Sequence, residues 1–306
     1  MITSLAGGVG AAKFLDGLVR VVKGEDISII VNTGDDIELY GLHISPDIDI
    51  VIYTLAGIVD DKKGWGIKGD TFNCLGKLEK FGYETWFKVG DKDLATHINR
   101  SILLKKGLKL SEVTDRECKV LGVKAKIIPM TDDYVKTIVI TDKGEIHFQE
   151  YMVKSKTQER VLQIRFKGVT KAKPAPGVIN SIKKARIIII CPSNPIVSIG
   201  TILSIQEIRE SLKDTKAKVI GISPLIAGKT VKGPADKLMN SLGMEVSAYG
   251  VAKLYQDFLD AFVIDIADKN LKERIESLGI KVFVTDTIMR GLREKKELAK
   301  FTLEAI

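Results

Sequence analysis

Three glycines lie close together near the start of the chain, in the sequence Gly7-Gly8-Val9-Gly10, and Lys13 follows after two further residues. Glycines between a strand and a helix let backbone N–H groups approach a phosphate, which then lies at the positive end of the helix. Lys13 could add a full charge, or could simply be solvated. The spacing is not that of the ATP-binding P-loop, and Lys13 stands where a dinucleotide motif has its third glycine. The loop therefore predicts a phosphate site, with an empty tight turn as the alternative.

Four aspartates follow the apolar segment 27–31, namely Asp35, Asp36, Asp47 and Asp49. The first two come just past the end of an expected strand, where open α/β sheets bind their ligands. Carboxylates beside a phosphate loop repel the ligand unless a divalent cation lies between them. Magnesium prefers one or two carboxylates together with substrate phosphates. A helix cap or an Asx turn accounts for at least one of the four, and we expect two to act on a metal or on substrate.

A third motif places Lys88 and Gly90-Asp91-Lys92-Asp93 before a helical segment that contains His97. Asp91 or Asp93 is equally well explained as the N-cap of that helix. His97 is better explained as a hydrogen-bonded structural histidine than as a catalytic base.

A fourth motif, Pro192-Ser193-Asn194-Pro195, follows the apolar run 187–190 and opens a helix. The prolines fix the loop, and Ser193 and Asn194 supply hydrogen-bond donors and acceptors. The loop again lies at the carboxyl end of an expected strand, where it would complete a nucleotide pocket opposite the glycine loop.

Short apolar runs alternate with helical segments over most of the chain, which predicts a parallel sheet covered on both faces. The fold class is therefore α/β, a Rossmann-like three-layer core. Helices are expected at 11–22, from 174 to 184, from the Pro195 loop to about 212, and at 289–303. The expected strands of the sheet are residues 2–6, 27–31, 125–130, 187–190, 219–223, 262–265 and 281–284.

Residues 50–123 change to helical periodicity broken by turns, and we interpret them as a small helical insertion into a core of residues 1–49 and 124–306. Its helices are expected at 50–59, 72–81, 91–106 and 110–121. Beyond it, the segments 135–140 and 145–153 predict a hairpin closed at Asp142-Lys143-Gly144, followed by a strand at 161–166.

Composition excludes several classes of protein. No apolar run reaches the ~20 residues that span a bilayer, and no secretory signal is visible. The three scattered cysteines argue against a disulfide framework or a zinc site and favour a reducing, cytoplasmic location. The net charge of +8 comes from lysines spread over the chain, so neither a nucleic-acid nor a membrane partner is expected.

Taken together and in this order, the motifs resemble the 2-phospho-L-lactate transferase family, and the resemblance covers nearly the whole chain. Two positions depart from the family pattern: Thr201 stands where proline is usual, and Ala11 where glycine, threonine or proline is usual. The matching stretches are Gly7-Gly8-Val9-Gly10 with Lys13, Asn32-Thr33-Gly34-Asp35-Asp36, Ser45-Pro46-Asp47-Ile48-Asp49, the segment 90–97, His147-Phe148-Gln149-Glu150, Pro192-Ser193-Asn194-Pro195, Ser223-Pro224 and the segment 232–239.

The resemblance implies a step in the biosynthesis of coenzyme F-420. A phospholactyl group, or in some relatives an enolpyruvyl one, would pass from a guanosine diphosphate-linked donor to the deazaflavin 7,8-didemethyl-8-hydroxy-5-deazariboflavin, and GMP would leave. The family also implies magnesium and a homodimer. Carried over residue by residue, Asp49 and Lys88 contact the deazaflavin. The residues implied to face guanosine diphosphate are Gly7, Gly8, Gly10, Ser193, Asn194 and Pro195.

The implied reaction is a displacement at phosphorus by the terminal ribityl hydroxyl, which needs positioning and charge neutralisation more than covalent catalysis. We expect Asp35, Asp36 and Asp49 to hold magnesium, and Lys13 to neutralise remaining charge. Asp36 and Asp49 are the expected catalytic residues, with Asp49 accepting the hydroxyl proton. Two alternatives are a nucleotide- or sugar-nucleotide-binding regulatory protein and an NAD-dependent oxidoreductase, in which Asp35 would bind the ribose.

Overall fold

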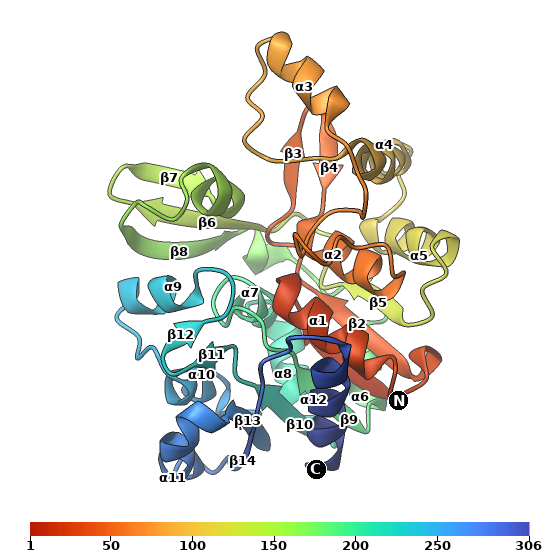
Figure 1. Cartoon of the computed structure of the whole chain (residues 1–306). Coiled ribbons are helices and arrows are strands. Elements are labelled where there is room, and N and C mark those ends of the chain that lie inside the picture. Colours follow the sequence, from red (N-terminus) through yellow and green to blue (C-terminus); the bar gives the residue numbers. More distant parts are fainter. Residues whose placement is uncertain (306) are drawn as a thin grey trace.

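Seven apolar strands pair in one parallel sheet, in the order β14-β13-β10-β9-β1-β2-β5, in a computed structural model that describes residues 1–305 (Figure 1). Every residue of β1, β2, β9 and β13 is buried, as expected for strands covered on both faces. The predicted α/β, Rossmann-like fold is confirmed. The strands are β1 (Ile2–Ala6), β2 (Ile27–Val31), β5 (Lys126–Pro129), β9 (Ile187–Ile190), β10 (Lys218–Ile222), β13 (Ala261–Asp265) and β14 (Lys281–Thr285).

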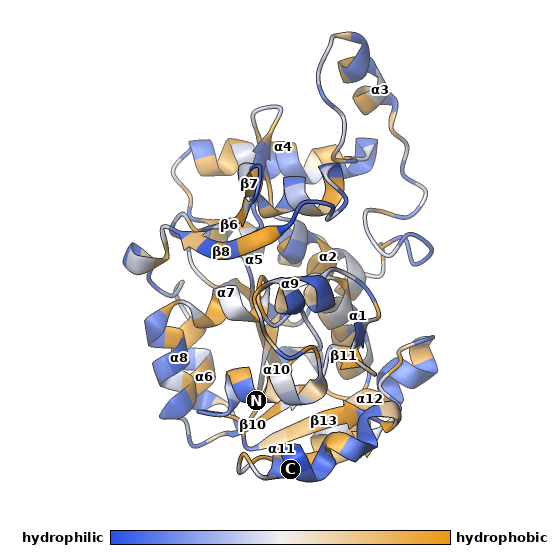
Figure 2. Ribbon diagram, turned by 90° about the vertical axis from the view of Figure 1, so that its left-hand side faces the viewer, coloured by the Kyte–Doolittle hydropathy of each residue, from blue (hydrophilic) through white to orange (hydrophobic). Residues whose placement is uncertain are grey.

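Side chains that alternate along these strands supply two cores, one on each face of the sheet. Ile188 and Ile190 belong to one core, and Ile187 and Ile189 to the other. Figure 2 shows the hydrophobic residues concentrated on the strands and the hydrophilic ones on the outer helices. The first core is covered by α6 (Val178–Lys184), α7 (Ile199–Leu203), α8 (Gln206–Lys213), α9 (Ala235–Ser241), α10 (Ala248–Tyr255) and α11 (Lys272–Glu276). The second is covered by α1 (Gly8–Leu18), α2 (Pro46–Leu55), α5 (Leu110–Val120) and α12 (Leu292–Glu304).

Strand β1 lies at the point where the order of the sheet reverses. It pairs with β2 on one side and with β9 on the other. The chain therefore runs outward through β2 and β5 in one direction and through β9, β10, β13 and β14 in the other. Ligands of open α/β sheets bind outside the carboxyl ends of strands at such a switch point. Three of the four motifs follow β1, β2 and β9.

The helices expected within the insertion are present, with one difference at the first. Those expected at 72–81, 91–106 and 110–121 are α3 (Asn73–Lys80), α4 (Asp91–Lys105) and α5. The first, expected from residue 50, begins at Pro46. Proline is favoured at the first helical position, and acidic residues are favourable in the first turn. Asp47 and Asp49 therefore lie on α2 and not in a loop.

A hairpin that the sequence analysis did not predict joins β3 (Ile37–Leu39) to β4 (Leu42–Ile44). Its two turn residues, Tyr40 and Gly41, have φ of 55° and 73°, the backbone of a tight hairpin turn. The hairpin and α3 project from the sheet at the top of Figure 1. Its inward side chains pack with Val89 in a small third core. The division into a core and an insertion stays a prediction.

The expected hairpin after β5 is part of a separate antiparallel sheet, β7-β6-β8. Its strands are β6 (Lys136–Thr141), β7 (Gly144–His147) and β8 (Val161–Lys167). The expectation that the second strand continues to residue 153 is wrong, because Glu150–Lys154 form a π-helical turn, η2. Phe148, just before this turn, and Tyr151, within it, are three positions apart and both enter the first core, which an extended strand would not allow.

The single helix expected to reach about residue 212 is two helices, α7 and α8. At the break, the Ser204 hydroxyl donates to the carbonyl of Thr201, and such local bonds compete with continued helix. No helix within residues 1–305 is both long and apolar enough to cross a bilayer. The remaining elements are η1 (Gly24–Asp26), η3 (Val169–Lys171), η4 (Ile266–Leu271), β11 (Leu225–Ile226) and β12 (Lys229–Thr230).

Candidate functional site

The glycine loop and the Pro192–Pro195 loop meet at the carboxyl ends of β1 and β9. The Gly7 N–H donates to Ser193 Oγ at 3.3 Å. A Cβ on Gly10 would overlap the carbonyl oxygen of Pro192, so the close approach requires glycine there. Asn194 Oδ1 accepts from the N–H of Ile196 at 2.9 Å, which shapes the loop, while Asn194 Nδ2 has no partner within residues 1–305. Pro195 is buried.

Asp47 lies against the glycine loop. A Cβ on Gly7 would stand 2.8 Å from Asp47 Oδ2 and 2.6 Å from the Cβ of Ser198, and Gly8 has a φ of 70°, so both positions favour glycine. Asp47 Oδ2 accepts from Asn32 Nδ2 at 2.9 Å. Burial raises the pKa of Asp47 to about 7, against the lowering effect of the Asn32 hydrogen bond. Asp47 is one of the four aspartates noted in the sequence, but no role was predicted for it.

Asp35 and Asp36 occupy the turn after β2, and both are buried. Asp36 Oδ2 accepts from the Ser45 hydroxyl at 2.8 Å and lies 3.0 Å from His43 Nε2. Burial raises the pKa of each carboxyl, and the negative charge of Asp47 raises that of Asp35 further. The structure therefore brings Asp35, Asp36 and Asp47 into mutual electrostatic contact.

These carboxylates offer a partial metal site. Within the described chain, no group of three His, Cys, Asp or Glu side chains is arranged to hold a metal ion. However, Asp35 Oδ1 and Asp36 Oδ1 are buried and have no hydrogen-bond partner among residues 1–305. Two free carboxylate oxygens suit magnesium, which completes its coordination with water and substrate phosphates.

Asp49, which was expected to join them, binds a different partner. Arg100 of α4 donates to both of its carboxylate oxygens, at 3.0 Å from Nη1 to Oδ2, and also from Nη2 to Oδ1. The same guanidinium contacts Glu117 of α5. Arg100 and Glu117 carried no signal in the sequence beyond their charge, because their partners are far away along the chain.

The Gly90-Asp91-Lys92-Asp93 motif is largely structural. Asp91 accepts from the N–H groups of Asn73 and Cys74, so it caps α3 and not its own helix. The hydrogen bond from the Thr71 hydroxyl, together with these two, lowers the pKa of Asp91 to about 2. Asp93 accepts from the Tyr53 hydroxyl at 2.6 Å. Lys88 lies exposed just before the motif.

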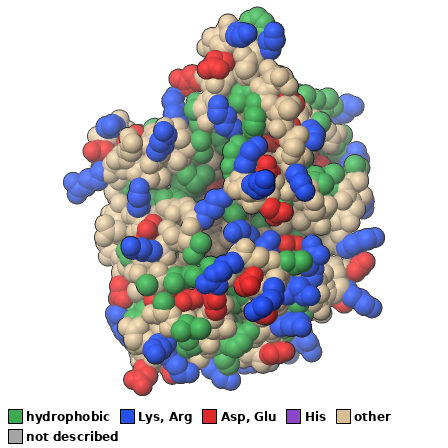
Figure 3. All heavy atoms as spheres, viewed as in Figure 1, with side chains coloured by type: hydrophobic (Ala, Val, Ile, Leu, Met, Phe, Trp, Pro, Cys, Tyr) green, Lys and Arg blue, Asp and Glu red, His purple; other side chains and the backbone are tan. Residues whose placement is uncertain are grey.

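Lys232 lies near Lys13, beside the glycine loop. In the sequence it was noted only as part of the matching segment 232–239. Lys232 Nζ donates to the carbonyl of Lys63 at 3.2 Å. A Cβ on Gly64 would stand 2.8 Å from Lys232 Nζ and 3.8 Å from Val9, so the three segments meet. Partial burial and the charge of Lys13 lower the pKa of Lys232. Figure 3 shows basic side chains around the hollow in the middle of this face.

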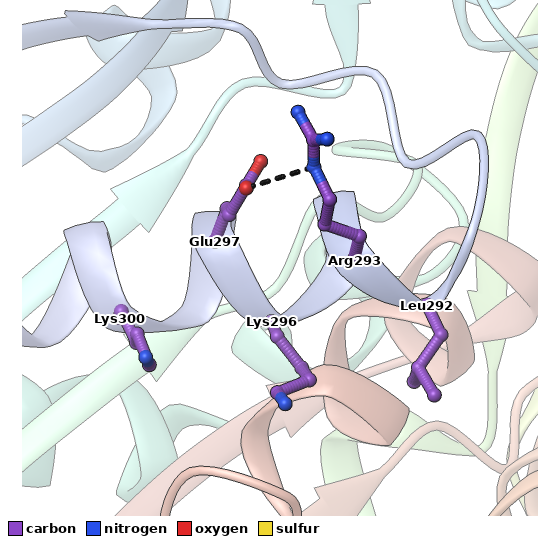
Figure 4. Close-up of a pocket in the computed structure, with 5 residues that line it drawn as sticks. All are labelled: Leu292, Arg293, Lys296, Glu297 and Lys300. Atoms are coloured by element: carbon purple, nitrogen blue, oxygen red, sulfur yellow. Dashed lines mark hydrogen bonds and ion pairs between the residues drawn. The ribbon is translucent and has the colours of Figure 1, made fainter.

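A separate shallow hollow on α12 does not belong to this site (Figure 4). Its lining comes from one helix, and the Nε of Arg293 pairs with Glu297 at 3.0 Å. The side chains that line it are Leu292, Arg293, Lys296, Glu297 and Lys300.

Comparison with known proteins gives consistent matches. Residues 2–299 match the family model of 2-phospho-L-lactate transferase CofD. A 2-phospho-L-lactate transferase from Methanocaldococcus jannaschii is 42% identical over 308 residues, covering 99% of this chain and 97% of the relative. A phosphoenolpyruvate transferase from Kitasatospora aureofaciens is 41% identical, covering 99% and 96%. A crystal structure of a Bacillus halodurans protein shares the fold, with a TM-score of 0.68 at 15% identity, covering 99% of this chain and 98% of that one.

Proposed function

Because the chain belongs to the 2-phospho-L-lactate transferase family and is a transferase, we propose that it acts on the implied substrates of coenzyme F-420 biosynthesis. It moves a 2-phospho-L-lactyl group, or an enolpyruvyl phosphate group, from a guanosine diphosphate-linked donor to 7,8-didemethyl-8-hydroxy-5-deazariboflavin. GMP is the leaving group. The regulatory and oxidoreductase alternatives are set aside by this membership. The enzyme is further proposed to be a cytoplasmic homodimer.

The observation that carries the proposal is the meeting of three motif loops at the switch point of the sheet. On the donor side, the glycine loop, Ser193 and Asn194 present backbone and side-chain polar groups. Lys13 and Lys232 add positive charge at the same place. A diphosphate bound there would lie at the N-terminal end of α1, where the helix dipole favours anions.

We place magnesium at Asp35 and Asp36, whose free buried oxygens suit it. When bound, the ion would neutralise charge on the diphosphate as GMP departs. Asp49 is left out of this site because the positively charged guanidinium of Arg100 binds both of its oxygens and would repel a second cation. Its proposed role is contact with the deazaflavin, together with Lys88.

In the proposed reaction, the terminal ribityl hydroxyl oxygen bonds to the phosphorus that carries the lactyl group, and the bond from that phosphorus to the oxygen of GMP breaks. The hydroxyl proton must leave at the same time. Asp47 is better suited than Asp49 to accept it, because its pKa of about 7 is near neutrality. The Asp49 carboxylate instead already accepts hydrogen bonds from Arg100 on both of its oxygens.

The direct test mixes the protein with the deazaflavin, magnesium and either donor, and follows GMP by chromatography and the product by mass. GMP release that requires the deazaflavin supports the proposal. No release with either donor contradicts it. A 2-phospho-L-lactate transferase and a phosphoenolpyruvate transferase are almost equally similar to this chain. The ratio of kcat/KM for the two donors therefore decides which donor this enzyme uses.

A further inference from the structure

We propose that Arg100 is a positioning residue for Asp49, and that Glu117 holds Arg100 in place. Helices α4 and α5 would then aim a substrate-binding carboxylate that is carried by α2. This inference rests on the proposed contact between Asp49 and the deazaflavin.

The geometry of the Arg100 guanidinium is that of a two-point clamp. Nη1 and Nη2 each donate to a different oxygen of Asp49, and Nη2 also lies 2.8 Å from Glu117 Oε2. The Arg100 side chain is 0% exposed. A planar fork that binds both oxygens fixes the rotation of a carboxylate, which a single ammonium does not do.

The charges in this cluster argue for a role beyond packing. Two buried carboxylates share one arginine, and burial raises the pKa of Glu117 although Arg100 lowers it. Buried ion clusters are commonly no more stabilising than apolar side chains of the same volume. Because stability alone does not account for this buried ion cluster, we infer that one of its members must stay charged and correctly oriented for function.

The position of Asp49 connects the cluster to the site. Asp49 follows Asp47 by two residues in the first turn of α2, and Asp47 touches the glycine loop. Each carboxylate oxygen has two lone pairs, so one bond to Arg100 leaves acceptor capacity on both oxygens. The ring N–H and hydroxyl groups of the deazaflavin can donate hydrogen bonds to these remaining acceptor positions on Asp49.

A second buried group lies beside the same carboxylate. His97 is 1% exposed, its Nδ1 is 3.8 Å from Asp49 Oδ2, and its Nε2 is 3.3 Å from Asp93 Oδ1. Neither nitrogen makes a hydrogen bond within residues 1–305. Arg100 is thus the group that binds Asp49 directly, and it is the residue to test.

The test measures KM separately for the deazaflavin and for the donor, and the Kd of the deazaflavin alone, in Arg100→Lys and Glu117→Gln. We expect Arg100→Lys to weaken deazaflavin binding by about tenfold or more, as loss of an orienting partner does, with the donor KM unchanged. Glu117→Gln should shift the same constants in the same direction by less. Arg116→Lys, at an exposed position on α5, is the matched control.

A double-substitution cycle separates positioning from general damage. If Arg100 acts through Asp49, then Arg100→Lys should add little once Asp49→Asn is present. An equal rise in both KM values would overturn the inference, as would unchanged deazaflavin binding in Arg100→Lys. If Arg100→Lys is unfolded at the assay temperature, the KM values of Glu117→Gln for the deazaflavin and for the donor provide the test. Absence of GMP release by the unaltered enzyme would instead contradict the proposed function.

Discussion

The Asp47 carboxylate and Gly7 are in contact range across the site, so that any side chain on Gly7 would meet Asp47 Oδ2 at 2.8 Å from its Cβ. Asn32 holds the carboxylate there from the end of β2. The two motifs that the sequence places 40 residues apart are therefore one surface, and its groups and their neighbours lead to five predictions.

Replacing Gly7 by alanine should disrupt the donor side. The added Cβ would approach Ser198 to 2.6 Å, and the overpacking should lower the free energy of unfolding by about 1–3 kcal/mol and displace Asp47. Donor KM and thermal melting measure the two effects. Gly76→Ala is the control, since nothing lies within 4 Å of its Cβ position in α3. A Gly7→Ala enzyme with normal donor KM would contradict the proposed contact.

Asp47→Asn should remove a pH dependence of stability. Because the folded-state pKa of about 7 is above the ordinary 3.8, the unfolded chain loses the proton first as pH rises. The Asp47 carboxyl therefore destabilises the folded protein progressively between those values, and fully above them. Melting temperatures of both proteins across this range should show Asp47→Asn gaining relative stability at the upper end. A constant difference would contradict the raised pKa.

In turnover, Asp47→Asn and Asp49→Asn should behave differently. The first removes the proposed proton acceptor, so kcat should fall by about a hundredfold or more with little change in deazaflavin KM. The second should mainly raise the deazaflavin KM. Steady-state kinetics with both substrates varied distinguish them, and a large kcat loss confined to Asp49→Asn would return the proton-accepting role to Asp49.

Asp36→Asn should impair the use of magnesium. Losing one charged group at a developing phosphate charge costs on the order of 3 kcal/mol, or a hundredfold or more in rate. GMP release titrated with magnesium should show a higher half-saturating concentration. Glu38→Gln removes a nearby exposed carboxylate and should leave the titration unchanged. An Asp36→Asn enzyme with an unaltered magnesium titration would place the metal elsewhere.

Lys232→Gln should weaken the donor and leave the deazaflavin unaffected. A charge-assisted hydrogen bond contributes about 1.5–3 kcal/mol, which predicts a rise in donor KM of about tenfold or more. Calorimetric titration with GDP measures the affinity that depends on this contact, without turnover. Lys229→Gln, an exposed lysine on β12, provides the matched change in charge. Equal GDP affinity in both variants would remove Lys232 from the donor site.

The strands and the edge where the site lies follow from local sequence, because buried parallel strands are continuous apolar runs such as Ile187–Ile190 and loops follow them in order. The partners of Asp49 could not be predicted. Arg100 lies 51 residues away and Glu117 a further 17, and neither separation leaves a periodic signal. The start of α2 at Pro46 differs from the expected residue 50, because a first turn with one proline and two aspartates shows little apolar periodicity.

The central place of β1 has a consequence for synthesis of the chain on the ribosome. Its first neighbour, β2, emerges soon after it, but β9 begins only at Ile187. Until then β1 presents an open edge, and open edges of apolar strands invite pairing with other chains. Ser193 and Ser198, which close on the glycine loop, come later still. Nascent chains that stop before these residues are therefore expected to need chaperone protection and to bind no nucleotide.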